Sequence, residues 1–362
     1  TVHRAAAVLD TSDSSPHHTY TTVTTIVMLA SHTNTGDTMP TEPQASQSSP
    51  QPPAKARALS SVPPGLLNIM VTPFTPGEEV DVESLRTLTR WTVDAGVAGL
   101  VPLGIMGEAH KLSDRERDVV LGTVVDVAGD VPVVAGCTAE STVVAIERTR
   151  RAAEIGATAV MIAPPRAATT PTLQLAHYIA VADAGLLPIV IQDEPVTTGV
   201  TMTSATIGEL CSVDGIAAVK VEQIPSPTKV SGILDAAPTA SCYGGLGGLY
   251  LLEELDRGAV GIMTGFGYPE VLVDIHRRYA AGDVEGAWRV FHHWMPLIRY
   301  EAQLGVGGVA LRKQLLAERG AIAGPTTRRP AAAGDERSLG ELREMVSRLS
   351  ATDPTATAGA HL

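Results

Sequence analysis

The sequence predicts an α/β protein folded as a (β/α)8 TIM barrel, a closed parallel sheet ringed by helices, with a C-terminal helical appendage. Eight short runs are apolar on both faces, and each is followed by a helical pattern. Strands buried on both faces and alternating with helices indicate a parallel sheet. Eight such units over about 220 residues match a closed barrel. An open doubly wound sheet is the alternative, but no strand-adjacent G-x-G-x-x-G fingerprint supports it.

The predicted strands are short aliphatic runs, at 66–74, 97–104, 131–136, 157–165, 187–195, 215–223, 239–245 and 259–265. Amphipathic stretches between and after them predict the helices, at 81–96, 113–129, 138–156, 171–185, 203–212, 226–237, 246–258 and 268–282. Ser113 is the expected N-cap of the second helix, because its hydroxyl can accept a free backbone N–H of the first turn.

The chain outside the barrel divides into a tail and an appendage. Residues 1–62 are rich in Pro, Ser, Gln and Ala, which predicts a disordered tail or leader. The barrel is expected over 63–282, and 283–350 has the pattern of three further helices. Residues 351–362 are expected to be a flexible tail.

Composition narrows the possible partners. The 362 residues carry a net charge of −12, which argues against a nucleic-acid partner. Cys137, Cys211 and Cys242 form neither a metal set nor an even disulfide framework, so a reducing, cytoplasmic setting is expected. No apolar run reaches 18 residues, so no membrane span is expected. The histidines of "HHW" (292–294) have no partner ligands at metal spacing, so no metal site is expected.

Lys220 is the residue on which the functional reading depends. It ends the apolar run "GIAAVK" of the sixth strand, and barrel chemistry occurs at the C-terminal ends of the strands. Burial favours the neutral amine, which attacks a ketone or aldehyde to form an imine. The alternative is a purely structural ion pair with Glu222 or Asp193.

Five motifs resemble the dihydrodipicolinate synthase / N-acetylneuraminate lyase family. They are "VTPF" (71–74), "LGIMGE" (103–108), "VPVVAG" (131–136), "DEPVTTG" (193–199) and "VK" (219–220). The resemblance implies a (β/α)8 barrel that forms a homo-oligomer, a tetramer or dimer. It also implies that Lys220 forms a Schiff base with pyruvate or another 2-oxo acid, without a cofactor.

The resemblance also suggests a substrate-binding loop. In the family, the backbone amides of the "GIMGE" segment hold the carboxylate of the 2-oxo acid, which points here to Gly104, Ile105, Met106 and Gly107. Ile105 and Met106 replace the family's hydroxyl residues, but backbone N–H groups do not depend on the side chain. Glu108 is expected to hold this loop in place rather than to act in catalysis.

Two further positions at the strand ends complete the expected binding surface. Thr72 lies at the end of the first predicted strand, and Gly244 lies at the end of the seventh, in "YGGLGG". We expect Gly244 to allow the backbone to approach the substrate closely.

The departures from the family argue against lysine biosynthesis. Gln192 stands where the family carries its proton-relaying tyrosine, and Gln does not titrate. Thr197 stands where dihydrodipicolinate synthases place an arginine for the second substrate. Pro165 and Arg166 replace a tyrosine pair, and Arg166 could bind an anionic second substrate or be a solvated loop charge.

Three residues could take over the proton transfer, in the order Glu222, Glu194 and Tyr243. Glu222 has the strand parity of Lys220, and Glu194 has that of Gln192. Tyr243 ends the seventh strand and could reach the pocket with its phenol. For each acid, a structural ion pair is the competing interpretation.

The leading hypothesis is an aldolase or lyase that joins a 2-oxo acid to an aldehyde, or cleaves the product. Dehydration of a 2-oxo-3-deoxy sugar acid through the same imine is the alternative within the family. The alternative that is not an enzyme is a catalytically silent barrel that binds a ligand.

Overall fold

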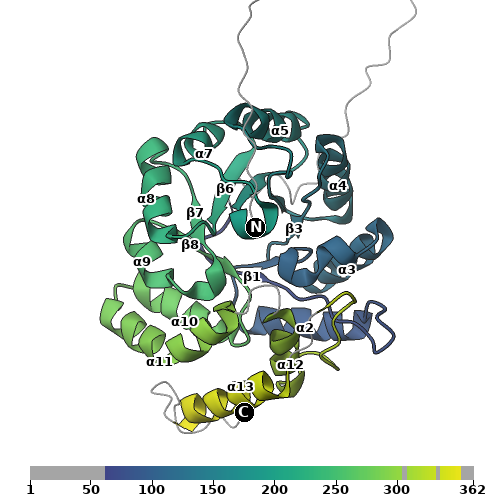
Figure 1. The fold of residues 1–362 in the computed structure, drawn as a ribbon, viewed down its shortest axis with the longest axis vertical. Helices are drawn as coiled ribbons and strands as arrows, with labels where there is room; N and C mark the ends of the chain where they lie inside the picture. The colour runs from purple at the N-terminus through teal and green to yellow at the C-terminus, as the bar shows by residue number, and fades with distance from the viewer. Residues whose placement is uncertain (1–61, 304–307, 332–334, 352–362) are drawn as a thin grey trace, which may run out of the picture. The chain divides into compact units, whose positions relative to one another are not determined.

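The computed structural model describes residues 62–303, 308–331 and 335–351, and it confirms the predicted barrel. Eight parallel strands form one sheet in the order β2-β1-β8-β7-β6-β5-β4-β3. A parallel bridge between Leu100 and Val133 joins the two ends of this order, so the barrel is nearly closed (Figure 1). The strands are β1 Gly65–Ile69, β2 Gly99–Val101, β3 Val134–Gly136, β4 Ala159–Ile162, β5 Ile189–Asp193, β6 Ile216–Val221, β7 Cys242–Gly244 and β8 Gly261–Thr264.

Helices follow the strands in chain order and surround the sheet. They are α2 Val82–Asp94, α3 Asp114–Val127, α4 Thr142–Ile155, α5 Pro171–Asp183, α6 Pro195–Thr198, α7 Ser204–Leu210, α8 Ser226–Ala236, α9 Leu251–Asp256 and α10 Pro269–Ala280. Short 3-10 turns precede α3 (Ile105–Gly107 and Ala109–Lys111) and α9 (Leu246–Gly248). The Ser113 cap is confirmed: Ser113 and Glu116 form a reciprocal capping box at the start of α3.

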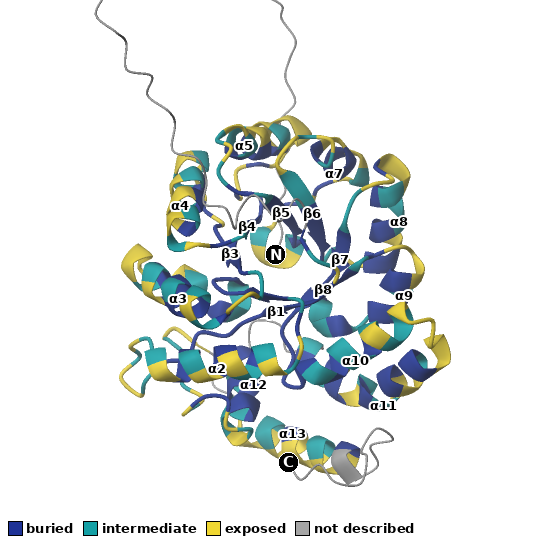
Figure 2. Cartoon of the chain, turned by 180° about the vertical axis from the view of Figure 1, so that it is seen from behind, coloured by how far each residue is buried: buried dark blue, intermediate teal, exposed yellow. Residues whose placement is uncertain are grey.

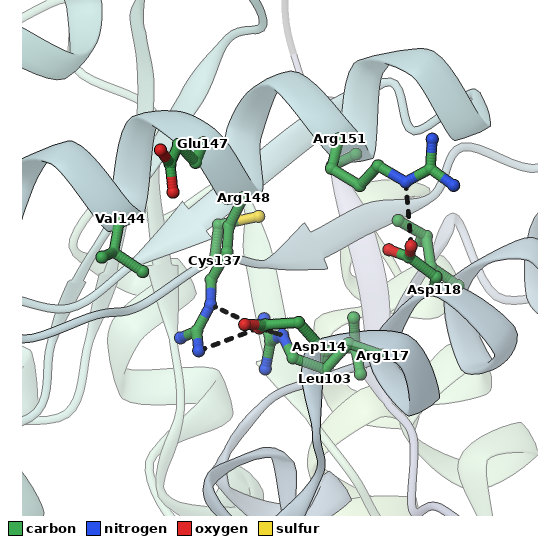
Figure 3. A pocket seen from close by; sticks show the side chains of 11 residues that line it. Leu103, Asp114, Arg117, Asp118, Cys137, Val144, Glu147, Arg148 and Arg151 are labelled. Carbon is green, nitrogen blue, oxygen red and sulfur yellow. Dashed lines mark hydrogen bonds and ion pairs between the residues drawn. The ribbon is translucent and has the colours of Figure 1, made fainter.

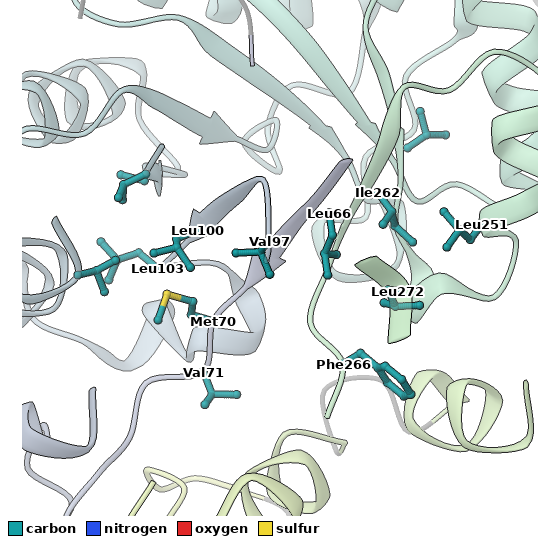
Figure 4. Packing of buried hydrophobic residues seen from close by; sticks show 14 of the residues in the cluster. Leu66, Met70, Val71, Val97, Leu100, Leu103, Leu251, Ile262, Phe266 and Leu272 are labelled. Atoms are coloured by element: carbon teal, nitrogen blue, oxygen red, sulfur yellow. The ribbon is translucent and has the colours of Figure 1, made fainter. Parts of the chain in front are cut away.

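Alternation along the strands builds two apolar layers. Leu67, Val134 and Tyr243 belong to a cluster that fills the barrel interior. Leu66 and Ile262 belong to a second cluster between sheet and helices, as Figure 4 shows. Buried positions lie on the strands and on the inward sides of the helices (Figure 2). This packing fills the barrel with apolar side chains between the strands and helices, so the polar groups of Lys220 and its neighbours lie at the strand ends.

The predicted C-terminal appendage is helical. It consists of α11 Val284–Gln303, α12 Gly308–Glu318 and α13 Glu336–Ala351. Helix α11 packs against α10, and both α11 and α12 contact α13 (Figure 1).

The tails predicted at 1–62 and 351–362 lie almost wholly outside the described residues. Val62, however, is described and buried, so it belongs to the barrel. None of the helices within the described ranges is sufficiently long and apolar to span a membrane.

Candidate active site

Lys220 lies at the C-terminal end of β6, where neighbouring strands bring polar side chains beside it. Residues of adjacent strands pair Gln192 with Lys220 and Lys220 with Tyr243. The Lys220 side chain is 6% exposed, and its Nζ lies 3.0 Å from Oε2 of Glu222. The amide Nε2 of Gln192 donates to the same Oε2 at 3.0 Å. The structure therefore brings three of the predicted site residues into one cluster, in which Lys220 and Gln192 are buried and Glu222 is partly exposed.

Glu222 is oriented by the absence of a side chain at Gly245. A Cβ at Gly245 would lie 2.4 Å from Cγ of Glu222, so any larger residue would displace the carboxylate. Asp193, the other ion-pair partner considered for Lys220, instead lies 3.6 Å from Nζ of Lys229 on α8. Burial raises the pKa of Asp193 to about 6. The carboxylate beside Lys220 is therefore that of Glu222.

A cavity of about 620 Å³ leads to this cluster. Gly104, Ile105 and Gln192 line its inner part, while Arg148 and Arg166 line it from α4 and the loop after β4. Gln192 connects the cavity to Lys220, because its amide donates to Glu222, whose carboxylate lies 3.0 Å from the lysine amine. The volume of the cavity exceeds what a three-carbon 2-oxo acid would fill, which leaves room for a second substrate.

The "GIMGE" loop forms the 3-10 turn that borders the cavity. The amide of Gly107 donates to the Gly104 carbonyl, so it is engaged within the turn. The amides of Ile105 and Met106 make no hydrogen bond to another described residue, which leaves these two for a carboxylate. Leu103, immediately before the turn, has φ +64°, a left-handed conformation that is uncommon for leucine.

The predicted anchoring role of Glu108 fits its contacts. Its Oε1 lies 2.7 Å from Nζ of Lys313, a lysine with a fully buried side chain on α12. Its Oε2 lies 2.9 Å from Nζ of Lys111 and accepts the backbone amide of Arg328. Burial lowers the pKa of Lys313 to about 8, while the attraction of Glu108 opposes that shift. The C-terminal segment thus ties down the loop that borders the cavity.

Two of the expected substrate contacts have partners within the protein. The hydroxyl of Thr72 donates to the Gly107 carbonyl at 2.7 Å, so it connects two loops and is buried. Gly244 leaves room for a carboxyl group rather than for substrate, since a Cβ there would lie 1.6 Å from Oε2 of Glu254. The sequence analysis did not single out Glu254. The available signal was Gly244, because a glycine at a strand end can make room for a side chain from the neighbouring helix.

Two of the candidate proton-transfer groups are also directed elsewhere. The phenol of Tyr243 donates to the carbonyls of Val62 and Pro63, which precede β1 at the opposite end of the barrel. Its expected reach into the pocket is therefore corrected, because a strand position fixes the face but not the direction of a long side chain. Glu194 caps α6, and its Oε2 accepts the backbone amide of Thr197 at 2.9 Å.

Arg166 does line the cavity, but its side chain is 71% exposed. Its Nε lies 3.7 Å from Glu140, while its backbone amide donates to the same carboxylate. Burial raises the pKa of the Cys137 and Cys242 thiols to about 12, so neither is an activated nucleophile. Across the described ranges, no three His, Cys, Asp or Glu side chains are placed to hold a metal ion.

A smaller cavity of about 190 Å³ adjoins the first, between α3 and α4 (Figure 3). Arg117 and Arg148 line both cavities. Asp114 lies near both guanidinium groups, at 3.7 Å from Nε of Arg117 and 3.1 Å from Nη2 of Arg148. Sequence reasoning missed both arginines because they lie on helices rather than at strand ends.

The family model described as "Dihydrodipicolinate synthetase family" matches residues 63–349. A similar protein is the L-2-keto-3-deoxyarabonate dehydratase of Azospirillum brasilense, 30% identical over 305 residues, which are 82% of this chain and 97% of that protein. The 4-hydroxy-tetrahydrodipicolinate synthase of Stenotrophomonas maltophilia is 37% identical over 172 residues, 47% of this chain and 58% of that protein.

A solved structure shows the same architecture. The dihydrodipicolinate synthase of Rhodopseudomonas palustris superposes with a TM-score of 0.75 at 31% identity, covering 79% of this chain and 97% of that one.

Proposed function

The chain belongs to the dihydrodipicolinate synthetase family, and from that premise we propose that Lys220 forms an imine with pyruvate or a related 2-oxo acid and Glu222 transfers the protons. The chain is accordingly an enzyme of the Schiff-base lyase type. The observation that carries the assignment of residues is the 3.0 Å contact between Nζ of Lys220 and Oε2 of Glu222, next to Gln192, which lines the cavity.

Glu222 lies within hydrogen-bonding distance of the amine it would serve. It accepts a proton from the Lys220 ammonium, and the freed amine attacks C2 of the 2-oxo acid. A proton then moves from the adduct's nitrogen to its oxygen and gives a carbinolamine. The carboxyl of Glu222 donates its proton to that hydroxyl, which leaves as water and yields the protonated imine. The Glu222 carboxylate then removes a C3 proton from the protonated imine and gives a neutral enamine. In the synthetic direction the enamine adds to an aldehyde, and in the cleavage direction it forms when the aldehyde is released.

Gln192 takes a supporting part. Its amide donates to Oε2 of Glu222 and so holds that oxygen beside Lys220. This positioning role needs no titratable group, and Gln has none. Where the family uses a tyrosine as proton relay, this chain would use a carboxylate from the strand that carries the lysine.

The proposal is tested by intact-mass spectrometry after incubation with pyruvate and borohydride. We expect one reduced pyruvate adduct per chain, mapped to the peptide that contains Lys220 and absent from Lys220→Ala. Lys229→Met is the matched control, since Lys229 is also a buried lysine at this end of the barrel but forms its ion pair with Asp193 rather than with Glu222. No adduct with pyruvate or any other 2-oxo acid would instead favour a silent binding barrel.

Glu222→Gln separates proton transfer from binding. Loss of a general acid–base costs about 10²–10⁴-fold in rate. We therefore expect a much slower approach to the same trapped adduct, measured by quenching with borohydride at increasing times. An unchanged rate would assign the proton transfer to another group.

Dehydration of a 2-oxo-3-deoxy sugar acid is the second candidate. It is favoured by the dehydratase that matches over 97% of its own length, and by Thr197 at the family's arginine position. Incubation with such an acid distinguishes the reactions: dehydration gives one product lighter by one water, whereas cleavage gives two fragments.

We also propose that the protein is a cytoplasmic homo-oligomer, by analogy with the family. Sedimentation velocity of the purified chain would test the assembly, and cell fractionation would test the location.

A further inference from the structure

We propose that the cavity contains a binding site for a second anionic group of the substrate, formed by Arg148 with Arg117 behind it. The inference rests on the proposed function, because the first anionic group is the carboxylate of the 2-oxo acid held at Lys220. The second group belongs to the far end of the substrate, the part that is joined or released as the aldehyde. Its chemistry is that of a carboxylate or a phosphate.

The position of the two arginines supports this site. Both line the same cavity that Gln192 borders at its inner end. They project from α3 and α4 toward Asp114, and Figure 3 shows the guanidinium groups converging there. A substrate attached at Lys220 and extending along the cavity would therefore present its far end to these side chains.

The charges lining the cavity are unbalanced, although the whole chain is acidic at −12. Arg117, Arg148 and Arg166 line it, whereas Glu140 is its acidic lining residue. The single carboxylate of Asp114 pairs with both Arg117 and Arg148. Its side chain is 73% exposed, so water weakens its attraction to the two guanidinium groups. The balance of charge among these groups is positive, which favours an anion.

Arg117 is an incompletely compensated buried cation. Its side chain is 8% exposed, and its guanidinium donates to the carbonyl of Gly136. Burial lowers the pKa of Arg117, and repulsion by Arg148 adds to that shift, while Asp114 and Asp118 oppose it. The carboxylate nearest to this buried charge, that of Asp114, lies 3.7 Å away and is largely exposed, so an anion bound at this point would be stabilised.

Arg148 is held ready for such a ligand. Its Nη1 donates to the Thr138 carbonyl at 2.7 Å, and its Nε donates to Asp114 at 3.1 Å. These contacts fix the guanidinium plane and leave further N–H groups for a ligand. Arg166, by contrast, is 71% exposed and would lose more side-chain freedom on binding. The structure therefore favours Arg148 over Arg166.

The test compares 2-oxo acids of equal length with and without a second carboxylate. Borohydride trapping would be measured for 2-oxoglutarate against 2-oxopentanoate, and for 2-oxoadipate against 2-oxohexanoate. A 2-oxo acid ending in a phosphonate distinguishes a phosphate site from a carboxylate site. A charge-assisted contact is worth about tenfold in affinity or more. We expect one dianionic probe to be trapped at about tenfold lower concentration than its neutral counterpart.

The variants locate the site. Arg148→Met should remove the preference for the dianionic probe and leave trapping of pyruvate unchanged, while Arg148→Lys should retain part of it. Arg166→Met, the matched control, should keep the preference. Equal trapping of both probe classes by the parent protein would overturn the inference, as would a loss confined to Arg166→Met. Absence of any pyruvate adduct would instead refute the proposed function, and the inference with it.

Discussion

Replacing Lys313 with methionine should destabilise the protein and loosen the loop at the cavity. Methionine fills nearly the same volume as the lysine stem, so no cavity arises and the change is electrostatic. The substitution removes the 2.7 Å ion pair with Glu108, the donor to the Thr326 carbonyl at 2.9 Å, and the cation 4.3 Å from the Phe74 ring centroid. Glu108, itself buried, would then keep Lys111 and the Arg328 amide at Oε2.

The magnitude follows from these contacts. Removing one partner of a buried ion pair costs about 3–5 kcal/mol, because the other charge stays buried. Since Lys111 still compensates one oxygen of Glu108, we expect the lower end of that range, about 3 kcal/mol. Urea unfolding would measure the free energy of unfolding, and borohydride trapping would measure the half-saturating pyruvate concentration. Both should worsen, since Glu108 directly follows the "GIM" turn.

A second variant and a control make the reasoning refutable. Adding Glu108→Gln to Lys313→Met removes the stranded charge and should restore about 2 kcal/mol. Arg312→Met breaks a comparably buried pair with Glu301, at 2.9 Å, so it should lower stability with less effect on pyruvate trapping. A loss of less than about 1 kcal/mol in Lys313→Met, or simple additivity of the two substitutions, would show that the stranded Glu108 charge is not the cause of the instability.

Three further predictions concern groups around the strand ends. Burial raises the pKa of Glu254 from 4.5 to about 8, so between these pH values the folded state holds one proton that the unfolded state has lost. The free energy of unfolding should therefore fall as the pH rises through this range, by at most about 1.4 kcal/mol per pH unit. Urea unfolding at a series of pH values should show this slope, and Glu254→Gln should flatten it. Gly244→Ala should cost about 1–3 kcal/mol in the same assay, since its methyl would lie 1.6 Å from Oε2 of Glu254. Tyr243→Phe should cost about 1–2 kcal/mol by leaving the carbonyls of Val62 and Pro63 without a donor, while the rate of pyruvate trapping stays unchanged.

Each of these has a contradicting result. A parent protein whose stability is flat across the pH window would show that Glu254 ionises normally. A fully stable Gly244→Ala would mean that the Glu254 carboxyl moves freely. Slow imine formation in Tyr243→Phe would show that the Tyr243 phenol takes part in the proton transfer.

The barrel could be predicted because its signal is local and repeated. The run 187–191 is apolar without interruption, and 113–129 carries both a cap and a helical period, so each element is specified by a few neighbouring residues. The position of Lys220 followed from the same pattern, since it ends a strand. Parity along β6 then placed Glu222 on the same side, and the structure shows the two in contact.

The contacts that complete the site depend on residues far apart in the chain. Lys313 and Glu108 are 205 positions apart, and no local pattern relates them. From the sequence, Gly244 is expected to face the substrate, but in the structure the Glu254 carboxyl lies where a side chain at position 244 would be. Side-chain direction is a further limit, since Tyr243 has the expected face but its hydroxyl lies toward Val62.

The sequence by itself determined the (β/α)8 barrel, the appended helices and the lysine at the end of the sixth strand, because these follow from hydrophobic period and from the polarity of a parallel sheet. Only the tertiary structure decided which carboxylate meets that lysine, which glycine accommodates a buried acid, and which arginines converge on the cavity. Those choices depend on how separate elements pack and how long side chains lie between them, and neither property is encoded within one element.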